Sequence, residues 1–144
     1  MLPKMKKLVK EKDLCVLATV SGSRPHCSLM AYVADEDCRK IYMVTLRDTK
    51  KFQNLTQNPA VSLLIDTREE DAGPQRSRAK ALTVNGIFQG VERGKQEQIR
   101  SLLLERHPHL RDLMGKEKAE IFSIRIESLQ LQGGIIDSYF ERMD

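Results

Sequence analysis

The stretch Thr45-Leu46-Arg47-Asp48-Thr49-Lys50-Lys51-Phe52-Gln53-Asn54-Leu55 joins two kinds of local structure. It leaves an apolar run of strand length, and Asp48 or Thr49 can cap a helix because a side-chain oxygen accepts a hydrogen bond from the first helical turn. Asn58-Pro59 ends that helix, since a proline disfavours the helical conformation of the residue before it. The run Val61-Ser62-Leu63-Leu64-Ile65 follows, so the sequence predicts a strand, a short helix and another strand in succession.

Three apolar runs at the start of the chain, residues 14–20, 26–33 and 41–46, are separated by polar turns. The first turn is Ser21-Gly22-Ser23-Arg24-Pro25, in which glycine and proline favour a hairpin. The second turn is Asp35-Glu36-Asp37-Cys38-Arg39. Successive strands joined by short turns pair in antiparallel fashion, and we therefore expect a three-stranded meander.

Residues 81–91 alternate between apolar and polar side chains, which predicts a long strand. Gly86 and Gly90 inside it indicate a bend or bulge of the kind that a closing barrel needs. The other expected elements are a last strand at residues 121–131, an amphipathic helix over residues 2–12, an exposed loop over residues 67–78, and a helix that runs from about Lys95 to near Pro108.

Six predicted strands, mostly antiparallel, with two or three short helices indicate a mainly β fold, namely a compact β-barrel with helices at its ends. An open sheet with helices on one side fits the same pattern of elements. The 144 residues contain no internal repeat and no linker long enough to divide them. We therefore expect a single domain over residues 1–144.

The composition limits the classes of function. Hydrophobic residues make up 40% of the chain and charged residues 31%, which is typical of a soluble globular protein. The net charge of +4 is modest, and the chain has no Trp and only seven Phe and Tyr, so we expect no nucleic-acid partner. No apolar run approaches the roughly 18 residues of a membrane span, and the start of the chain lacks the apolar core of a signal peptide. We expect a cytoplasmic protein with no membrane partner.

The cysteines and histidines form no recognisable metal motif. Cys15, Cys27 and Cys38 are odd in number and lack the paired spacing of a zinc site, so we expect reduced thiols. His107 and His109 stand two residues apart rather than four, and are expected at a helix end. The sequence therefore predicts no metal site.

Residues 45–55, followed by Asn58-Pro59-Ala60-Val61, resemble a signature of the pyridoxamine-phosphate-oxidase-like FMN-binding split-barrel family. In that family a strand ends in threonine, a basic residue opens the next helix, and an Asn-Leu pair and then Asn-Pro-x-Val lead into the following strand. The resemblance extends to residues 18–25 upstream and to Val84-Asn85-Gly86 and Leu131-Gln132-Gly133-Gly134 downstream. It implies a six-stranded antiparallel split barrel that binds FMN.

The resemblance also implies that the FMN phosphate lies where the third strand passes into its helix. Thr45 and Thr49 would place hydroxyls near the phosphate and the ribityl chain, and Arg47 would be a further contact. Lys50 and Lys51 lie in the predicted first turn, where the positive end of the helix disfavours lysine, so an anion nearby would explain them. The alternative is that both lysines are simply solvated, since surface lysines are common.

By the same resemblance, Ser28-Leu29-Met30 on the second strand would lie along the isoalloxazine ring. Without it, Leu29 and Met30 are ordinary core residues. The pyridoxamine phosphate oxidases themselves carry basic residues on this strand, and their absence here argues against vitamin-B6 oxidation. Family members bind flavin at a dimer interface, so we expect a homodimer with FMN between its copies. The segment Ile135-Ile136-Asp137-Ser138-Tyr139-Phe140 departs from the usual family ending.

These expectations lead to an FMN-dependent oxidoreductase that acts on a small molecule. The sequence shows no Ser-His-Asp order and no pair of catalytic carboxylates, so no catalytic residue is assigned and the flavin would supply the reactivity. The alternatives are a non-catalytic flavin carrier, a binding module for haem or a deazaflavin, and a basic protein that binds nucleic acid. For haem, His26 is a conceivable ligand, although a surface position at a strand edge is its more ordinary role.

Overall fold

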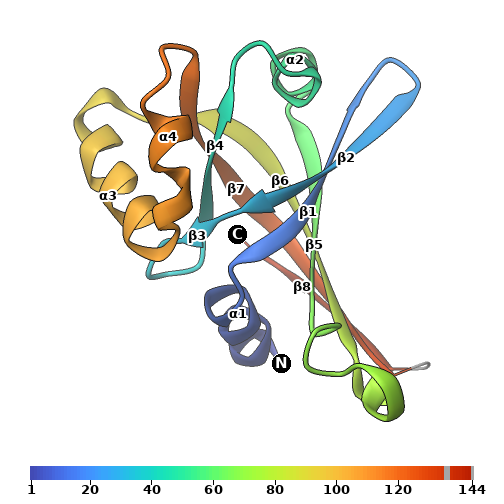
Figure 1. The fold of residues 1–144 in the computed structure, drawn as a ribbon. Helices are drawn as coiled ribbons and strands as arrows, with labels where there is room; N and C mark the ends of the chain where they lie inside the picture. The colour runs from blue at the N-terminus through green and yellow to red at the C-terminus, as the bar shows by residue number, and fades with distance from the viewer. Residues whose placement is uncertain (135–136, 144) are drawn as a thin grey trace.

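The fold is built on one antiparallel β-sheet of eight strands, seen in a computed structural model that describes residues 1–134 and 137–143 (Figure 1). Along the main path the strands follow the order β2, β1, β5, β6, β7, β4 and β3, and β8 pairs with β7. β7 is 15 residues long, so β4 pairs with its first half and β8 with its second half. The strands are β1 (Leu14–Ser21), β2 (Arg24–Ala31), β3 (Val33–Ala34), β4 (Lys40–Leu46), β5 (Ala60–Asp66), β6 (Lys80–Gly90), β7 (Ala119–Gly133) and β8 (Asp137–Arg142).

The sheet curls because its two outermost strands are neighbours in the sequence. β2 ends at Ala31 and β3 begins at Val33, yet these strands stand at opposite ends of the main path. Only Tyr32 separates them, so the two edges of the sheet must come round towards each other. The N–H of Tyr32 donates to the carbonyl of Asp13 at 3.0 Å, and its hydroxyl donates to the carbonyl of Val9 at 2.6 Å. These bonds hold the corner at which the sheet nearly closes.

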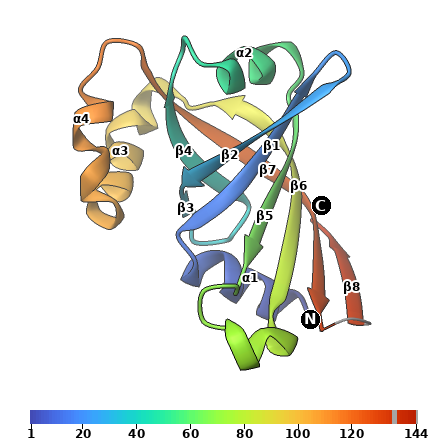
Figure 2. The same ribbon diagram turned by 45° about the vertical axis from the view of Figure 1, so that its right-hand side comes forward.

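Four short helices cover the ends and one outer face of the curled sheet. In Figures 1 and 2, α1 and α2 lie at opposite ends, whereas α3 and α4 lie beside β4. None of the helices in the described part of the chain has the length and apolar character needed to cross a membrane. The helices are α1 (Leu2–Glu11), α2 (Lys50–Gln57), α3 (Gln96–Arg106) and α4 (Arg111–Met114), with short 3₁₀ segments at Gly73–Arg78, Arg93–Lys95 and Pro108–Leu110.

Two apolar clusters lie on opposite faces of β4. Ile41 and Met43 point into the inner cluster, which fills the curled sheet, and both side chains are fully buried. Tyr42 and Val44 belong to the outer cluster, which Leu103 of α3 joins. A strand buried on both faces reads as a continuous apolar run, as residues 41–44 do. The mainly β fold with short helices is thus the one that the sequence predicts.

The bend predicted at Gly86 is present. The pairing of β6 with β7 shifts register between Asn85 and Gly86, which marks a β-bulge. A side chain at Gly86 would place its Cβ 2.6 Å from the carbonyl oxygen of Arg125 and 2.6 Å from Cγ2 of Ile124, so only glycine fits between the strands. Gly90 has open space around it and lies at the end of β6.

The strand count and one pairing differ from the expectation. The sequence predicts six strands, but the described residues form eight. One additional strand arises because the run at residues 26–33 divides at Tyr32, and the other is β8, which the sequence pattern does not predict. The expected meander is confirmed only in part. Val33 at the end of the predicted second strand pairs with Tyr42 of β4, but β2 itself does not pair with β4, whose longer partner is β7. Of the segment that departs from the family ending, Ile135 and Ile136 lie outside the described residues.

Candidate functional site

An open groove of about 390 Å³ lies where β2, the end of β4 and the start of α2 meet the helical segment between β6 and β7. Its volume is within the roughly 300–1,000 Å³ of small-molecule sites. Most of its lining is aliphatic, and the polar side chains are few. The polar members are Thr45, Thr49, Lys51 and His109.

Lys51 provides the positive charge of the groove. Its side chain is half-buried, and Nζ lies 3.3 Å from Sδ of Met30, a weak acceptor. None of the ion pairs between described residues involves Lys51. Burial without a carboxylate partner lowers the pKa of the Lys51 ammonium below its ordinary value. A cation in this position favours a bound anion.

The first turn of α2 adds hydrogen-bond donors to the same place. Thr49 caps the helix, since its Oγ1 accepts from the N–H of Phe52 at 3.3 Å and donates to the carbonyl of Leu46 at 2.9 Å. The N–H groups of Lys50 and Lys51 are the first two of the helix and have no intrahelical acceptor. Neither appears among the backbone hydrogen bonds of the described residues. Free amides at the positive end of a helix bind anions.

The groove brings five of the eight predicted site residues together and leaves three outside. Ser28 is partly buried on β2 and does not line it. Arg47 lies outside it, with Nη1 3.6 Å from Oε1 of Glu120 in an ion pair that is largely exposed. Lys50 is exposed on the outer side of α2. The five that line the groove are Leu29, Met30, Thr45, Thr49 and Lys51.

The sequence gives no signal for the far wall of the groove. His109, Leu110 and Leu113 come from the helical segment more than fifty residues after Lys51, and only the folded chain places them there. The ring of His109 lies 5.6 Å from that of His107, edge to face. His107 is buried, and its Nε2 is 2.9 Å from the carbonyl oxygen of Tyr32, so it joins the helical segment to the corner between β2 and β3.

The donors of the groove fit a phosphate monoester on an apolar body. A phosphate carries three acceptor oxygens and about two negative charges near neutral pH. The half-buried ammonium of Lys51, the hydroxyl of Thr45 and two free amides can supply those oxygens with donors, whereas the hydroxyl proton of Thr49 is already donated to the carbonyl of Leu46. The exposed Leu29 beside them offers an apolar surface for a planar ring. No group of three or more His, Cys, Asp or Glu in the described part of the chain could hold a metal ion.

One known protein family matches nearly the whole chain. The model of the family described as pyridoxamine 5'-phosphate oxidase matches residues 1–133. No curated protein sequence matches the chain.

Several solved structures share the fold at low sequence identity. The heme storage protein HutZ of Vibrio cholerae is 24% identical, with a TM-score of 0.73 over 92% of this chain and 93% of that chain. A FAD-binding protein from Mesorhizobium loti is 19% identical, with a TM-score of 0.74 over 91% and 93%. A heme-binding protein from Mycobacterium smegmatis is 14% identical, with a TM-score of 0.81 over 96% of this chain, which spans 57% of that longer chain. The chain therefore belongs to the pyridoxamine 5'-phosphate oxidase family and has its split-barrel fold.

Proposed function

We propose that the protein binds FMN in the groove, with the flavin phosphate at Lys51. The observation that carries this proposal is a half-buried ammonium with no carboxylate partner among the described residues, beside the free amides of a helix start. A buried charge is costly unless it is paired, so this arrangement favours a ligand that brings the opposite charge. Phosphate does so, and it would also accept from the hydroxyl of Thr45.

Different side chains of the groove would contact different parts of the flavin. Lys51 would neutralise the phosphate, and the amides of Lys50 and Lys51 would donate to its oxygens. Leu29, whose side chain is 72% exposed, would pack on the isoalloxazine ring and lose that exposure to water. His109 also lines the groove, where its imidazole could form a hydrogen bond with the ligand.

When bound, FMN would accept and release hydride or single electrons, so the protein would be a flavin-dependent oxidoreductase acting on a small molecule. The chain would orient the flavin and exclude water from one of its faces. A flavin carrier without a reaction of its own is the related alternative. Turnover assays with NADH or NADPH and an artificial electron acceptor separate the two, because a carrier shows binding without turnover.

We also propose a homodimer with the flavin between its copies. The groove is open on one side, and Leu14 and Leu29 beside it are 46% and 72% exposed, so a second copy would cover both the leucines and the flavin. A cytoplasmic location is consistent with three cysteines that form no disulfide. The mass of the FMN-loaded protein by light scattering tests the dimer directly.

The test of FMN binding compares two ligands that differ only in the phosphate. We expect the purified protein to bind FMN, with a flavin absorbance band and quenched flavin fluorescence. We expect riboflavin, which lacks the phosphate, to bind at least about tenfold more weakly, because it loses the charge-assisted hydrogen bonds. Equal affinities would show that no phosphate is held at Lys51. Absence of binding by either ligand would exclude a flavin protein.

Haem is the second candidate, and His109 is the observation that favours it. His109 lines the groove with an exposed imidazole, and imidazole is a common axial ligand of haem iron. Two of the similar structures are of a heme storage protein and a heme-binding protein. A Soret band after addition of hemin that moves in a His109→Ala variant would favour haem over FMN. Tight binding of a deazaflavin in place of FMN would indicate a third ligand of the same groove.

A further inference from the structure

A second cavity, also of about 390 Å³, lies between the outer face of the sheet and the segment that leads from β6 into α3, and we call it the α3 cavity. Its floor is a row of three polar side chains. Tyr42 of β4 is directly opposite Ser123 of β7, and Ser123 is directly opposite Gln89 of β6, so the three stand side by side on one face of the sheet. The remaining side chains of its lining are Lys40, Val91, Glu92, Lys95 and Ile99.

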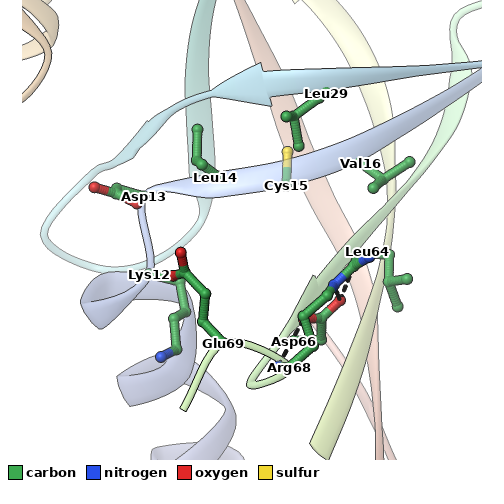
Figure 3. A pocket seen from close by; sticks show the side chains of 10 residues that line it. All are labelled: Lys12, Asp13, Leu14, Cys15, Val16, Leu29, Leu64, Asp66, Arg68 and Glu69. Atoms are coloured by element: carbon green, nitrogen blue, oxygen red, sulfur yellow. Dashed lines mark hydrogen bonds and ion pairs between the residues drawn. The ribbon is translucent and has the colours of Figure 1, made fainter. Parts of the chain in front are cut away.

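The α3 cavity is separate from the groove, because the two have no lining residue in common in the described part of the chain. The pocket at the start of β1 differs in this respect (Figure 3). It shares Leu14 and Leu29 with the groove, so the proposed flavin and second copy would cover it. A ligand of the α3 cavity would bind independently of FMN.

The floor of the α3 cavity contains a buried hydroxyl that the chain leaves unbonded. The Tyr42 side chain is 9% exposed, and its hydroxyl forms no hydrogen bond with any residue that the structure describes. Because no fully buried side-chain oxygen of those residues is without a partner, the Tyr42 hydroxyl must be open to the cavity. Burial, and to a smaller extent the carboxylate of Asp35, raise the pKa of Tyr42, so its hydroxyl keeps the proton and can donate.

Ser123 beside it is also poorly satisfied. It is 2% exposed, and its Oγ donates to the carbonyl of Gln89 at 3.4 Å, which is longer than the roughly 2.5–3.0 Å of a good O–H···O bond. Hydroxyl and amide groups can both donate and accept, and buried ones are normally hydrogen-bonded. The floor therefore favours a ligand that brings hydroxyl groups of its own.

The cations at the α3 cavity favour an anionic ligand. Lys40 lies two residues before Tyr42 on the same face of β4, is half-buried, and is directly opposite Arg125 of β7. Two like charges opposite each other across a sheet repel. Arg125 has a carboxylate within reach, since its Nη2 lies 3.9 Å from Oε2 of Glu127. Lys40 has no ion pair with any described residue, so a bound anion would relieve the repulsion.

A second ammonium group and one carboxylate complete the charges of the lining. Lys95 is exposed just before α3 and, like Lys40, forms no ion pair within the described residues. Glu92 is exposed on the same segment. Asp35 lies outside the lining, and its Oδ1 accepts the backbone N–H groups of Arg39 and Lys40 at 2.7 and 3.0 Å. Two ammonium groups against one carboxylate give the lining a positive charge.

We propose that the α3 cavity binds a small hydroxylated carboxylate, such as an open-chain sugar acid. The carboxylate would lie between Lys40 and Lys95. The hydroxyl groups would bond with Tyr42, Ser123 and Gln89, which both donate and accept. A volume of about 390 Å³ is within the range of small-molecule sites. The inference does not rest on the proposed function, because the cavity and the groove are separate.

Three probes that differ only at one end of a six-carbon chain test the proposal. At pH 7 gluconate is anionic, sorbitol is neutral and 1-amino-1-deoxysorbitol is cationic. We expect gluconate to bind at least about threefold more tightly than sorbitol, and the amine to bind most weakly, as measured by calorimetry. The Lys40→Met, Lys95→Met double variant should bind gluconate no better than sorbitol. The control is the Lys4→Met, Lys116→Met double variant, which removes the same charge from exposed lysines elsewhere and should keep the preference.

The hydroxyls of the floor are tested separately from the charges. Tyr42→Phe keeps the ring and removes the hydroxyl, so it should weaken gluconate and sorbitol alike by about two- to tenfold, the effect of one hydrogen bond. Tyr139→Phe is the matched control, because Tyr139 is exposed on β8, and it should change neither affinity. Amide NMR signals locate the ligand: those of Tyr42, Gln89 and Ser123 should shift on addition of gluconate, and those of Thr45 and Thr49 should not.

Several results would overturn the proposal. They are no saturable binding of gluconate, equal affinities for the three probes, an anion preference that survives removal of Lys40 and Lys95, and NMR shifts confined to the groove. The same titrations with and without FMN separate this proposal from the proposed function. Gluconate affinity should not depend on FMN, and it should be the same if the protein binds no flavin at all. Competition between gluconate and FMN would place both in the groove and refute the α3 cavity as a site.

Discussion

The Nζ of Lys51 lies 3.3 Å from the Sδ of Met30, so the first turn of α2 reaches across the groove to β2. A thioether is a weak acceptor for an ammonium group, and burial penalises the charge. The contact thus places the Lys51 ammonium where the chain offers it only a weak hydrogen-bond acceptor. A phosphate in the groove would replace the sulfur as the partner of Lys51, which links the local packing to the proposed ligand.

The first prediction concerns FMN affinity. Lys51→Met should weaken FMN binding by about 1–3 kcal/mol, the range for a charge-assisted hydrogen bond, and should leave riboflavin binding nearly unchanged. Flavin fluorescence titrations measure both affinities. Lys50→Met is the matched control, because Lys50 is exposed beside Lys51 and does not line the groove. An equal loss of FMN affinity in the two variants would show that the phosphate is attracted by the net positive charge of the region and is not bound by Lys51 in particular.

The second prediction concerns the stability of the unliganded protein. Burial lowers the pKa of Lys51 in the folded state, whereas the unfolded chain has the ordinary lysine pKa of about 10.4. At pH values between these two pKa values, unfolding takes up a proton. Below that window the lysine is charged in both states and the desolvation cost is present in full. Above it the lysine is neutral in both states and the cost vanishes.

Lys51→Met should therefore raise the free energy of unfolding at pH 7, and the difference from the native chain should shrink as the pH rises towards 10.5. Urea unfolding of both proteins at the two pH values measures this, and titration of other groups cancels in the difference. Saturating FMN should reverse the sign at pH 7, since it stabilises the form that binds it better. A variant that is less stable at pH 7 without FMN would show that the ammonium is not penalised by its surroundings.

Much of the groove could be predicted because its residues are close in sequence. Thr45, Thr49 and Lys51 lie within one strand-to-helix connection, and a cap, a helix start and a following Asn58-Pro59 are local features that sequence patterns report well. Arg47 belongs to the same stretch, but its side chain turns to Glu120 of β7, a partner distant in sequence. Local pattern therefore identifies the connection and not the direction of each side chain.

The parts that sequence analysis missed depend on contacts between distant segments. The break at Tyr32 has no local signal, because residues 26–33 have the composition of one strand, and the break is enforced when the carbonyl of Asp13 accepts the Tyr32 N–H. His109 reaches the groove through the position of α3 and α4 on the outer face of β4. Such placements follow from tertiary packing, which overrides local preference.

The third prediction concerns the bulge in β6. Gly86→Ala should destabilise the protein by about 1–3 kcal/mol, because the new methyl group would lie 2.6 Å from the carbonyl oxygen of Arg125, a backbone atom that cannot simply rotate away. Gly90→Ala is the control on the same strand, since nothing lies within 4 Å of its added Cβ, and its effect should be within about 0.5 kcal/mol. Urea unfolding measures both. Similar values for the two variants would mean that the β6–β7 pairing can open at little cost.

The last prediction concerns the attachment of α2 to the sheet. Nδ2 of Asn54 donates to Oγ1 of Thr19 at 3.1 Å, and the two residues are 1% and 2% exposed. Thr19→Val keeps the shape and removes the acceptor, so a buried amide donor is left unpaired, at a cost of about 1–3 kcal/mol. Thr56→Val is the control, because that residue is exposed and its hydroxyl donates to the carbonyl of Gln53 in the preceding turn.

Adding Asn54→Leu to Thr19→Val should recover part of the lost stability, because two apolar groups then replace two polar ones and nothing buried is unpaired. Urea unfolding measures the single and double variants, and the recovery is a coupling that only contacting residues show. FMN titration in the same set then reports on the groove, since α2 carries Lys51. If Thr19→Val weakens FMN binding and the double variant restores it, the hydrogen bond matters to the ligand by fixing α2. If neither variant changes the FMN affinity, the hydrogen bond between Asn54 and Thr19 does not affect how Lys51 holds the ligand.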